Sequence, residues 1–161
     1  AEANKHIEAS LSKKPNYTEA IFLKSQVQAA EGNLREAIIL AENASILAPN
    51  DPTVFFQLGL LKYNNRDNAG AVEALERAVL LAPSYANAKY FLGLSYNRLA
   101  MREKALAQFR DILVLNQGNQ EVEKIIANIE AGRDPFYEQS VERPEARETL
   151  PIEEEIVEEE E

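Results

Sequence analysis

The sequence contains no cysteine and only one histidine, His6. The lack of cysteine excludes a disulfide framework, a thiol nucleophile and a zinc site built on thiolates. A single histidine excludes a metal centre held by several imidazoles. No apolar run approaches the roughly 20 residues that a membrane-spanning helix needs, and the apolar core of a signal peptide is also missing. We therefore expect no metal, no cofactor and no direct membrane insertion.

The negative charge is concentrated at one end of the chain. The net charge is −10, and residues 136–161 hold 11 glutamates against Arg143 and Arg147. Residues 1–135 carry 16 acidic and 15 basic side chains, so the body is nearly neutral. A neutral body without a basic patch is a poor binder of nucleic acid, and an acidic tail repels phosphate. We therefore expect no nucleic-acid partner.

Four sets of small or helix-breaking residues recur with one period. Each set repeats every 34 residues, the spacing that separates Pro15 from Pro49. The sets are Pro15, Pro49 and Pro83; Ala3, Ala37, Ala71 and Ala105; Ser10, Ala44, Ala78 and Ile112; Ser25, Gly59 and Gly93. Several sets in one register indicate an internal repeat. The chain is therefore predicted to be a repeat protein.

Each repeat is predicted to contain two helices. In the middle copy, apolar residues at helical spacing run from Val54 to Leu61, a polar stretch at 63–68 interrupts them, and a second apolar stripe ends before Pro83. Proline cannot continue a helix because it lacks an N–H and clashes with the preceding turn. Gly59 and Ala78 are predicted to lie where the two helices approach each other most closely.

These residues resemble the tetratricopeptide repeat (TPR) family, whose repeat unit is about 34 residues long. The resemblance rests on Phe55, Leu58, Gly59, Ala71, Leu75, Ala78 and Pro83 in the middle copy, and on Leu92, Gly93, Tyr96, Ala105 and Phe109 in the next. Lys89, Ile112 and Gln117 depart from the family pattern. The resemblance implies an all-α, right-handed helix-turn-helix solenoid with an acidic C-terminal tail. Its expected parts are a half repeat at 1–17, repeats at 18–51, 52–85 and 86–119, a half repeat or capping helix at 120–135, and the tail at 136–161.

The register leaves an unpaired half repeat at each end. Residues 3–13 correspond to a second helix and residues 121–131 to a first helix, so the two could pair between neighbouring subunits. Such a head-to-tail contact builds a filament when it does not close into a ring. The expected joint consists of Ala3, Ile7 and Leu11 on one side and Val122, Ile125, Ile126 and Ile129 on the other. The alternative is that residues 121–131 form a capping helix.

In the TPR family the first helices line a concave groove. The corresponding positions here are Phe22, Gln26, Phe56, Leu60, Tyr63, Tyr90, Leu94 and Asn97. Aromatic side chains dominate binding energy at many interfaces, so this set favours an apolar or extended protein segment. Packing between neighbouring helices is the alternative role for Phe22, Phe56 and Tyr90. Some family members hold a C-terminal carboxylate with a clamp of Lys and Asn side chains. This sequence lacks that clamp, because the corresponding positions hold Phe22, Gln26, Gln57, Asn87 and Phe91.

The acidic tail has the composition of a disordered segment, because like charges repel and little apolar surface can be buried. Its apolar residues favour contacts instead, either with a neighbouring subunit or along a groove. The candidates are Phe136, Tyr137, Leu150, Ile152, Ile156 and Val157.

Catalytic chemistry is not indicated, because the acidic pairs of the body are expected on solvated helix faces and not in the buried setting that acid–base catalysis needs. We expect a non-catalytic interaction scaffold that self-assembles head to tail into a filament, with the tail bracing the joint. The alternative is a monomeric adaptor whose groove binds a segment of another protein. The run from Asn50 to Leu61 and that from Tyr90 to Leu94 also resemble the C-terminal repeat region of bacterial membrane proteins of the O-antigen-ligase type. That resemblance implies an extracellular or cell-surface location, with the cytoplasm as the alternative.

Overall fold

The computed structural model of the chain describes Ile7, Ala9 and residues 18–137. Residues 18–137 form seven α-helices and no strand: α2 (Thr18–Ala30), α3 (Leu34–Leu47), α4 (Pro52–Asn64), α5 (Asn68–Leu81), α6 (Ala86–Arg98), α7 (Arg102–Leu115) and α8 (Gln120–Glu130). The first helices α2, α4, α6 and α8 begin one repeat period apart, and so do the second helices α3, α5 and α7. The predicted all-α repeat is confirmed. The predicted half repeat at 1–17 and nearly all of the tail lie outside the described residues.

Short polar side chains determine where several helices begin. Asp51 precedes Pro52, and its carboxylate accepts a hydrogen bond of 2.8 Å from the backbone N–H of Thr53. Asp67 caps α5 in the same way through the N–H of Gly70, at 2.9 Å. These caps satisfy N–H groups that have no partner inside the helix. Proline at the first helical position needs no such partner.

The turn inside each repeat uses one left-handed residue. Gly32, Arg66 and Ala100 have φ values of 84°, 63° and 58°, and they occupy the same position in successive repeats. Glycine adopts this conformation freely, whereas a side chain with a Cβ is strained in it. The fold therefore requires a left-handed turn at this point even where the sequence supplies arginine or alanine.

The interhelix spacing inside each pair depends on the column of Ser25, Gly59 and Gly93, all of which are buried. A Cβ at Gly59 would lie 2.5 Å from Cγ of Leu75, and one at Gly93 would lie 2.8 Å from the ring of Phe109. Ser25 has room for its hydroxyl, which donates to the backbone oxygen of Ala37 at 2.9 Å. The predicted role of Gly59 as a spacer between paired helices is confirmed.

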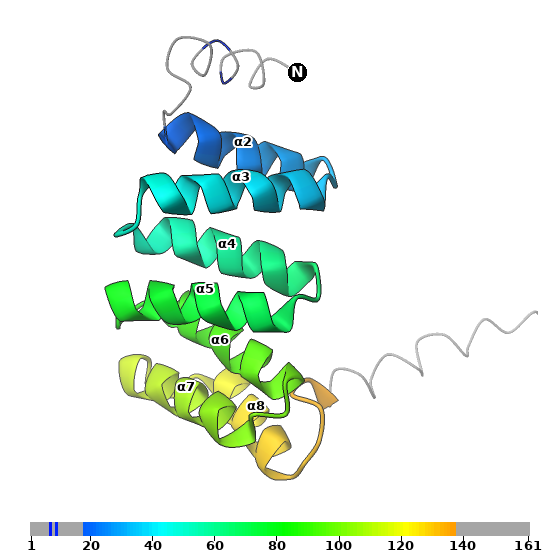
Figure 1. The fold of residues 1–161 in the computed structure, drawn as a ribbon. Helices are drawn as coiled ribbons and strands as arrows, with labels where there is room; N and C mark the ends of the chain where they lie inside the picture. Colours follow the sequence, from blue (N-terminus) through cyan, green and yellow to red (C-terminus); the bar gives the residue numbers. More distant parts are fainter. Residues whose placement is uncertain (1–6, 8, 10–17, 138–161) are drawn as a thin grey trace, which may run out of the picture.

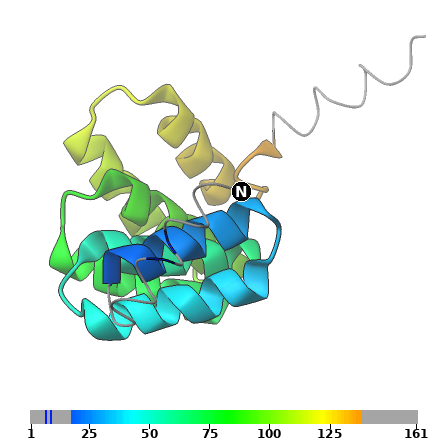
Figure 2. The same cartoon turned by 90° about the horizontal axis from the view of Figure 1, so that it is seen from above.

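The helices stack one after another from α2 to α8 (Figure 1). Figure 2, which looks along the stack, shows α7 and α8 displaced from α2 and α3, so successive pairs are offset. The buried residues of the largest core cluster lie on α5 to α8 and include Leu75, Leu92 and Phe109, and two smaller clusters join α2 to α5. Each pair therefore packs mainly on its neighbours, as expected for a solenoid.

The departures from the family pattern are absorbed by local contacts. Lys89 is buried, and its ammonium group lies 2.7 Å from a carboxylate oxygen of Asp111. Ile112 is buried in the main core cluster. Gln117 stands where a fourth proline of the series would be, yet α7 ends at Leu115, at the same register position as α3 and α5. Proline is therefore not required to end the second helix here.

Candidate functional site

The residues predicted for the groove lie on three first helices. We call them the first-helix face: Phe22 and Gln26 on α2, Phe56, Leu60 and Tyr63 on α4, and Tyr90, Leu94 and Asn97 on α6. Gln26 is exposed, and most of the others are partly buried. Leu94 differs, because it is buried in the main core cluster. The expectation that Leu94 lines an open groove is therefore corrected, and its role is packing.

One connected aromatic cluster joins three members of this face, Phe56, Tyr63 and Tyr90. Phe91 lies at its centre, with ring centroids 6.1 Å from Phe56, 5.4 Å from Tyr63 and 5.5 Å from Tyr90. Tyr85 adds a contact of 4.9 Å with Phe56. The sequence prediction named Phe91 only as a residue that replaces the clamp, and it missed Tyr85. The aromatic rings therefore pack between neighbouring helices while still leaving part of their surface accessible.

Two polar groups fix this aromatic cluster. The hydroxyl of Tyr90 donates to a carboxylate oxygen of Glu121 at 3.1 Å. Burial and the adjacent Glu121 carboxylate raise the pKa of Tyr90 to about 12, so its phenol remains a donor. The guanidinium of Arg98 stacks 3.7 Å from the centroid of Tyr63 and donates to the backbone oxygen of that residue. Burial raises the pKa of Tyr63. The positive charge of Arg98 opposes this rise, and the negative charge of Asp134 adds to it.

A pocket of about 550 Å³ lies at the other end of the face, between α2 and α4. Its apolar lining includes Phe22, Leu23 and Val54, and its polar lining includes Glu19 and Thr53. Leu23 is exposed although it is a large apolar residue. The pocket can hold an apolar side chain of a bound segment beside groups that form hydrogen bonds.

The C-terminal residues predicted for a subunit joint are placed in the chain's own core. Val122, Ile125 and Ile129 are buried against the main cluster, and Ile126 is partly buried against it. The exposed side of α8 carries Glu123, Lys124 and Ala127. A joint made by the isoleucines would require α8 to leave this core. On the other side of the joint, Ile7 is helical and buried, while Ala3 and Leu11 lie outside the described residues.

The first residues after α8 are held against the body. The side-chain amide of Asn128 donates to the backbone oxygen of Pro135 at 3.1 Å, and Phe136 packs against the main core cluster. Tyr137 is exposed, with the guanidinium of Arg133 5.1 Å from its ring. The other residues predicted for tail contacts lie outside the described part: Leu150, Ile152, Ile156 and Val157.

Residues 18–137, with Ile7 and Ala9, contain no group of three or more His, Cys, Asp or Glu side chains able to hold a metal ion. In this same part of the chain, every helix is too short or too polar to cross a bilayer. The chemistry offered by the first-helix face is apolar contact, stacking and hydrogen bonding.

Comparison with known proteins connects this geometry to a repeat family. The tetratricopeptide repeat model matches residues 52–85. The crystal structure of MamA is similar, with a TM-score of 0.74 and 23% identity over 87% of this chain and 85% of that one. MamA from Desulfovibrio magneticus RS-1 gives a TM-score of 0.74 and 18% identity over 90% of this chain and 85% of that one. The first TPR domain of Spaghetti (RPAP3), bound to an HSP90 peptide, gives a TM-score of 0.67 and 21% identity over 71% of this chain and 91% of that one.

A comparison with curated protein sequences gives no match. At these low identities the structural likenesses show the fold alone. Residues 52–85 match a tetratricopeptide repeat, and the helices from α2 to α8 have the fold of a tetratricopeptide-repeat solenoid.

Proposed function

We propose that the chain is a non-catalytic interaction scaffold that binds an extended segment of another protein along the first-helix face. TPR folds generally serve as interaction modules, and one similar structure holds a bound peptide. The observation that supports this proposal most directly is the partly buried aromatic row of Phe22, Phe56 and Tyr90, with a pocket of about 550 Å³ beside Phe22. Rigid, partly accessible aromatic rings bind apolar side chains at a low cost in conformational entropy.

The partner is expected to differ from the peptide of the HSP90-bound neighbour. Phe22, Gln26 and Phe91 occupy positions where carboxylate-binding members carry the clamp, so this face lacks the cations that hold a terminal carboxylate. We expect the peptide SRMEEVD, named for that neighbour, to bind the chain weakly or not at all.

The test is to select peptides on the full chain from a random display library and to measure their affinity by fluorescence anisotropy. Phe22→Ala and Asn97→Ala should each weaken binding by about tenfold, as expected for loss of an interface anchor. Glu103→Lys on α7, which is exposed on a second helix, serves as the control and should leave the affinity unchanged. Equal binding to the chain and to both first-helix variants would refute the proposal.

Head-to-tail self-assembly is the second candidate. It is favoured by the position of Ala127, which is exposed on α8 although the corresponding Ser25, Gly59 and Gly93 are buried under a second helix. A second helix from a neighbouring copy could cover that side of α8 without removing its isoleucines from the core. Electron microscopy and light scattering over a concentration series test this candidate. Filaments that are lost in Ala127→Arg support it, and a monodisperse 18.0 kDa species rejects it.

The extracellular or cell-surface location stays a prediction.

A further inference from the structure

A row of exposed aliphatic residues runs along the second helices, away from the first-helix face. Ile46, Leu80 and Val114 occupy the same position in successive repeats and are 75%, 69% and 77% exposed. Each is the next-to-last residue of its helix, two positions after a buried residue of the core. Single apolar residues on a surface are ordinary, but aligned ones commonly mark an interaction site. This row therefore calls for an explanation other than core packing.

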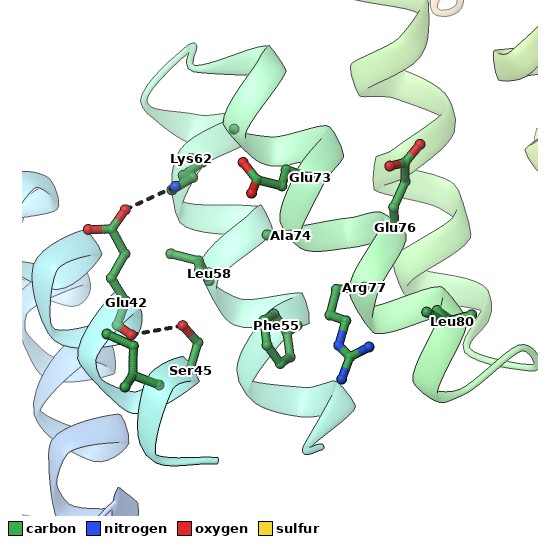
Figure 3. Close-up of a pocket in the computed structure, with 12 residues that line it drawn as sticks. Glu42, Ser45, Phe55, Leu58, Lys62, Glu73, Ala74, Glu76, Arg77 and Leu80 are labelled. Atoms are coloured by element: carbon green, nitrogen blue, oxygen red, sulfur yellow. Dashed lines mark hydrogen bonds and ion pairs between the residues drawn. The ribbon is translucent and has the colours of Figure 1, made fainter. Parts of the chain in front are cut away.

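A pocket of about 690 Å³ lies beside this row, between α3 and α5 and over α4. Figure 3 shows Phe55 and Leu58 of α4 on its floor, with Ala74 of α5 at its side. Ile46 and Leu80 form its aliphatic edges. We call it the α3–α5 pocket.

The corresponding positions between α5 and α7 carry larger side chains in three of four cases. Lys89 replaces Phe55 and pairs with Asp111 at 2.7 Å, while Tyr96 replaces Lys62 and donates to Glu76. Gly70 and Ala74 correspond there to Lys104 and Gln108, and the ammonium group of Lys104 lies 5.2 Å from the ring of Tyr96. The α3–α5 pocket is therefore open because its own repeat supplies a glycine and an alanine at these two positions.

The charges around the α3–α5 pocket give it an acidic rim. Lys62 is paired with Glu42 at 2.9 Å, and Arg77 donates to the backbone oxygen of Pro49 at 3.0 Å. Both lining cations thus contact groups of the chain itself, and so do the carboxylates of Glu42 and Glu76. Glu73 is exposed on the rim, and the lining carboxylates outnumber the lining cations by three to two. The local field favours positive charge, and it repels the chain's own acidic tail.

We propose that the α3–α5 pocket docks a second protein partner through an apolar side chain that has lysine or arginine beside it. The apolar side chain enters the space over Phe55 and Leu58, and the cation pairs with the carboxylates of Glu73 and Glu42. The site shares α4 with the first-helix face but has no residue in common with it. The array can therefore hold two partners at once.

The experiment measures by fluorescence anisotropy how tightly the full chain binds three short helical probe peptides. In these peptides leucines are flanked by lysine, by glutamine or by glutamate. The leucine–lysine probe should bind best and the leucine–glutamate probe worst. Ala74→Gln copies the residue of the next repeat into the pocket and should weaken binding by about tenfold or more. Glu73→Lys should reverse the preference between the charged probes. Glu103→Lys makes the same charge change on α7 and should not alter it.

A photo-cross-linker placed at the pocket identifies its occupant, both with the leucine–lysine probe present and without it. The chain has no cysteine, so Ser45→Cys at the pocket wall gives one attachment point. Cross-links to the leucine–lysine probe support the proposal. A cross-link between copies, or one within a chain to residues 138–161, would assign the pocket to self-association or to the tail and overturn it. Two further results would overturn it as well. One is equal binding of all three probes to the native chain. The other is equal binding of the leucine–lysine probe to the native chain, to Ala74→Gln and to Glu73→Lys.

Discussion

Gly59→Ala tests whether the contact between paired helices determines the residue at this position. Alanine is the better helix former, and in an exposed helix the change would stabilise the protein by about 0.5–1 kcal/mol. At Gly59, however, the new Cβ would lie 2.5 Å from Cγ and 2.8 Å from Cδ2 of Leu75, and 3.3 Å from its backbone nitrogen. Leu75 is fully buried and cannot move aside easily.

The expected net effect is a loss of stability. Forcing an extra carbon into a packed core costs about 1–3 kcal/mol. Subtracting the gain in helix propensity leaves a decrease of about 0–2.5 kcal/mol in the free energy of unfolding, with a central value of about 1 kcal/mol. Because a domain is usually stable by only about 5–15 kcal/mol, this decrease is measurable.

The measurement is urea unfolding followed by circular dichroism, with Leu75→Ala and the double variant included. Leu75→Ala removes both side-chain carbons that collide with the new Cβ and should itself cost about 2–5 kcal/mol. In that background Gly59→Ala should become neutral or slightly stabilising. The coupling energy of the cycle should then equal the packing cost of about 1–3 kcal/mol.

Ala127→Gly provides the matched control, because Ala127 occupies the same register position on α8 but is exposed. It should lose only the helix propensity, about 1 kcal/mol. A Gly59→Ala variant more stable than the native chain would contradict the reasoning. The same holds for a cycle without coupling, since it would mean that Leu75 is not the obstacle.

The remaining predictions concern a turn and a titration. Ala100→Gly should raise the free energy of unfolding by about 1 kcal/mol, because Ala100 has a strained φ of 58° that glycine adopts freely. The control Ala107→Gly, in the exposed part of α7, should lower the free energy of unfolding. A lower free energy of unfolding in both variants would contradict the strain at Ala100. Tyr90 binds its proton more tightly in the folded state, with a pKa of about 12 against 10.0. Its stabilising contribution is complete below pH 10 and is lost as the pH rises through 12. Ultraviolet titration of the native chain minus Tyr90→Phe should show one phenol ionising near pH 12, and ionisation near 10 would refute this.

The repeat was accessible from the sequence because it is encoded locally. Caps such as Asp51, the small residue at Gly59 and the apolar stripes of each helix act over a few residues, and their common period gives the helix starts. The left-handed turn at Arg66 and Ala100 was not predicted, because neither residue favours that conformation. There the tight connection between two packed helices overrides the local preference.

The candidate sites were predicted less well. The sequence placed Phe56, Tyr63 and Tyr90 on the first helices, but it did not identify Phe91 as the residue that connects them. It also assigned Leu94 to an open groove, whereas the structure buries it. The helical period gives the face on which a side chain lies, but it does not give the neighbouring helix that covers this face.

The sequence alone determined the repeat period, the pairing of a first with a second helix, and the separation of a nearly neutral body from an acidic tail. The tertiary structure decided which apolar residues are available for contact. Ile125 and Ile129 form a stripe that resembles an interface, yet they are buried in the chain's own core, while Ile46, Leu80 and Val114 are exposed. The reason is that burial depends on atoms supplied by other helices, and an amphipathic pattern carries no information about which helix supplies them.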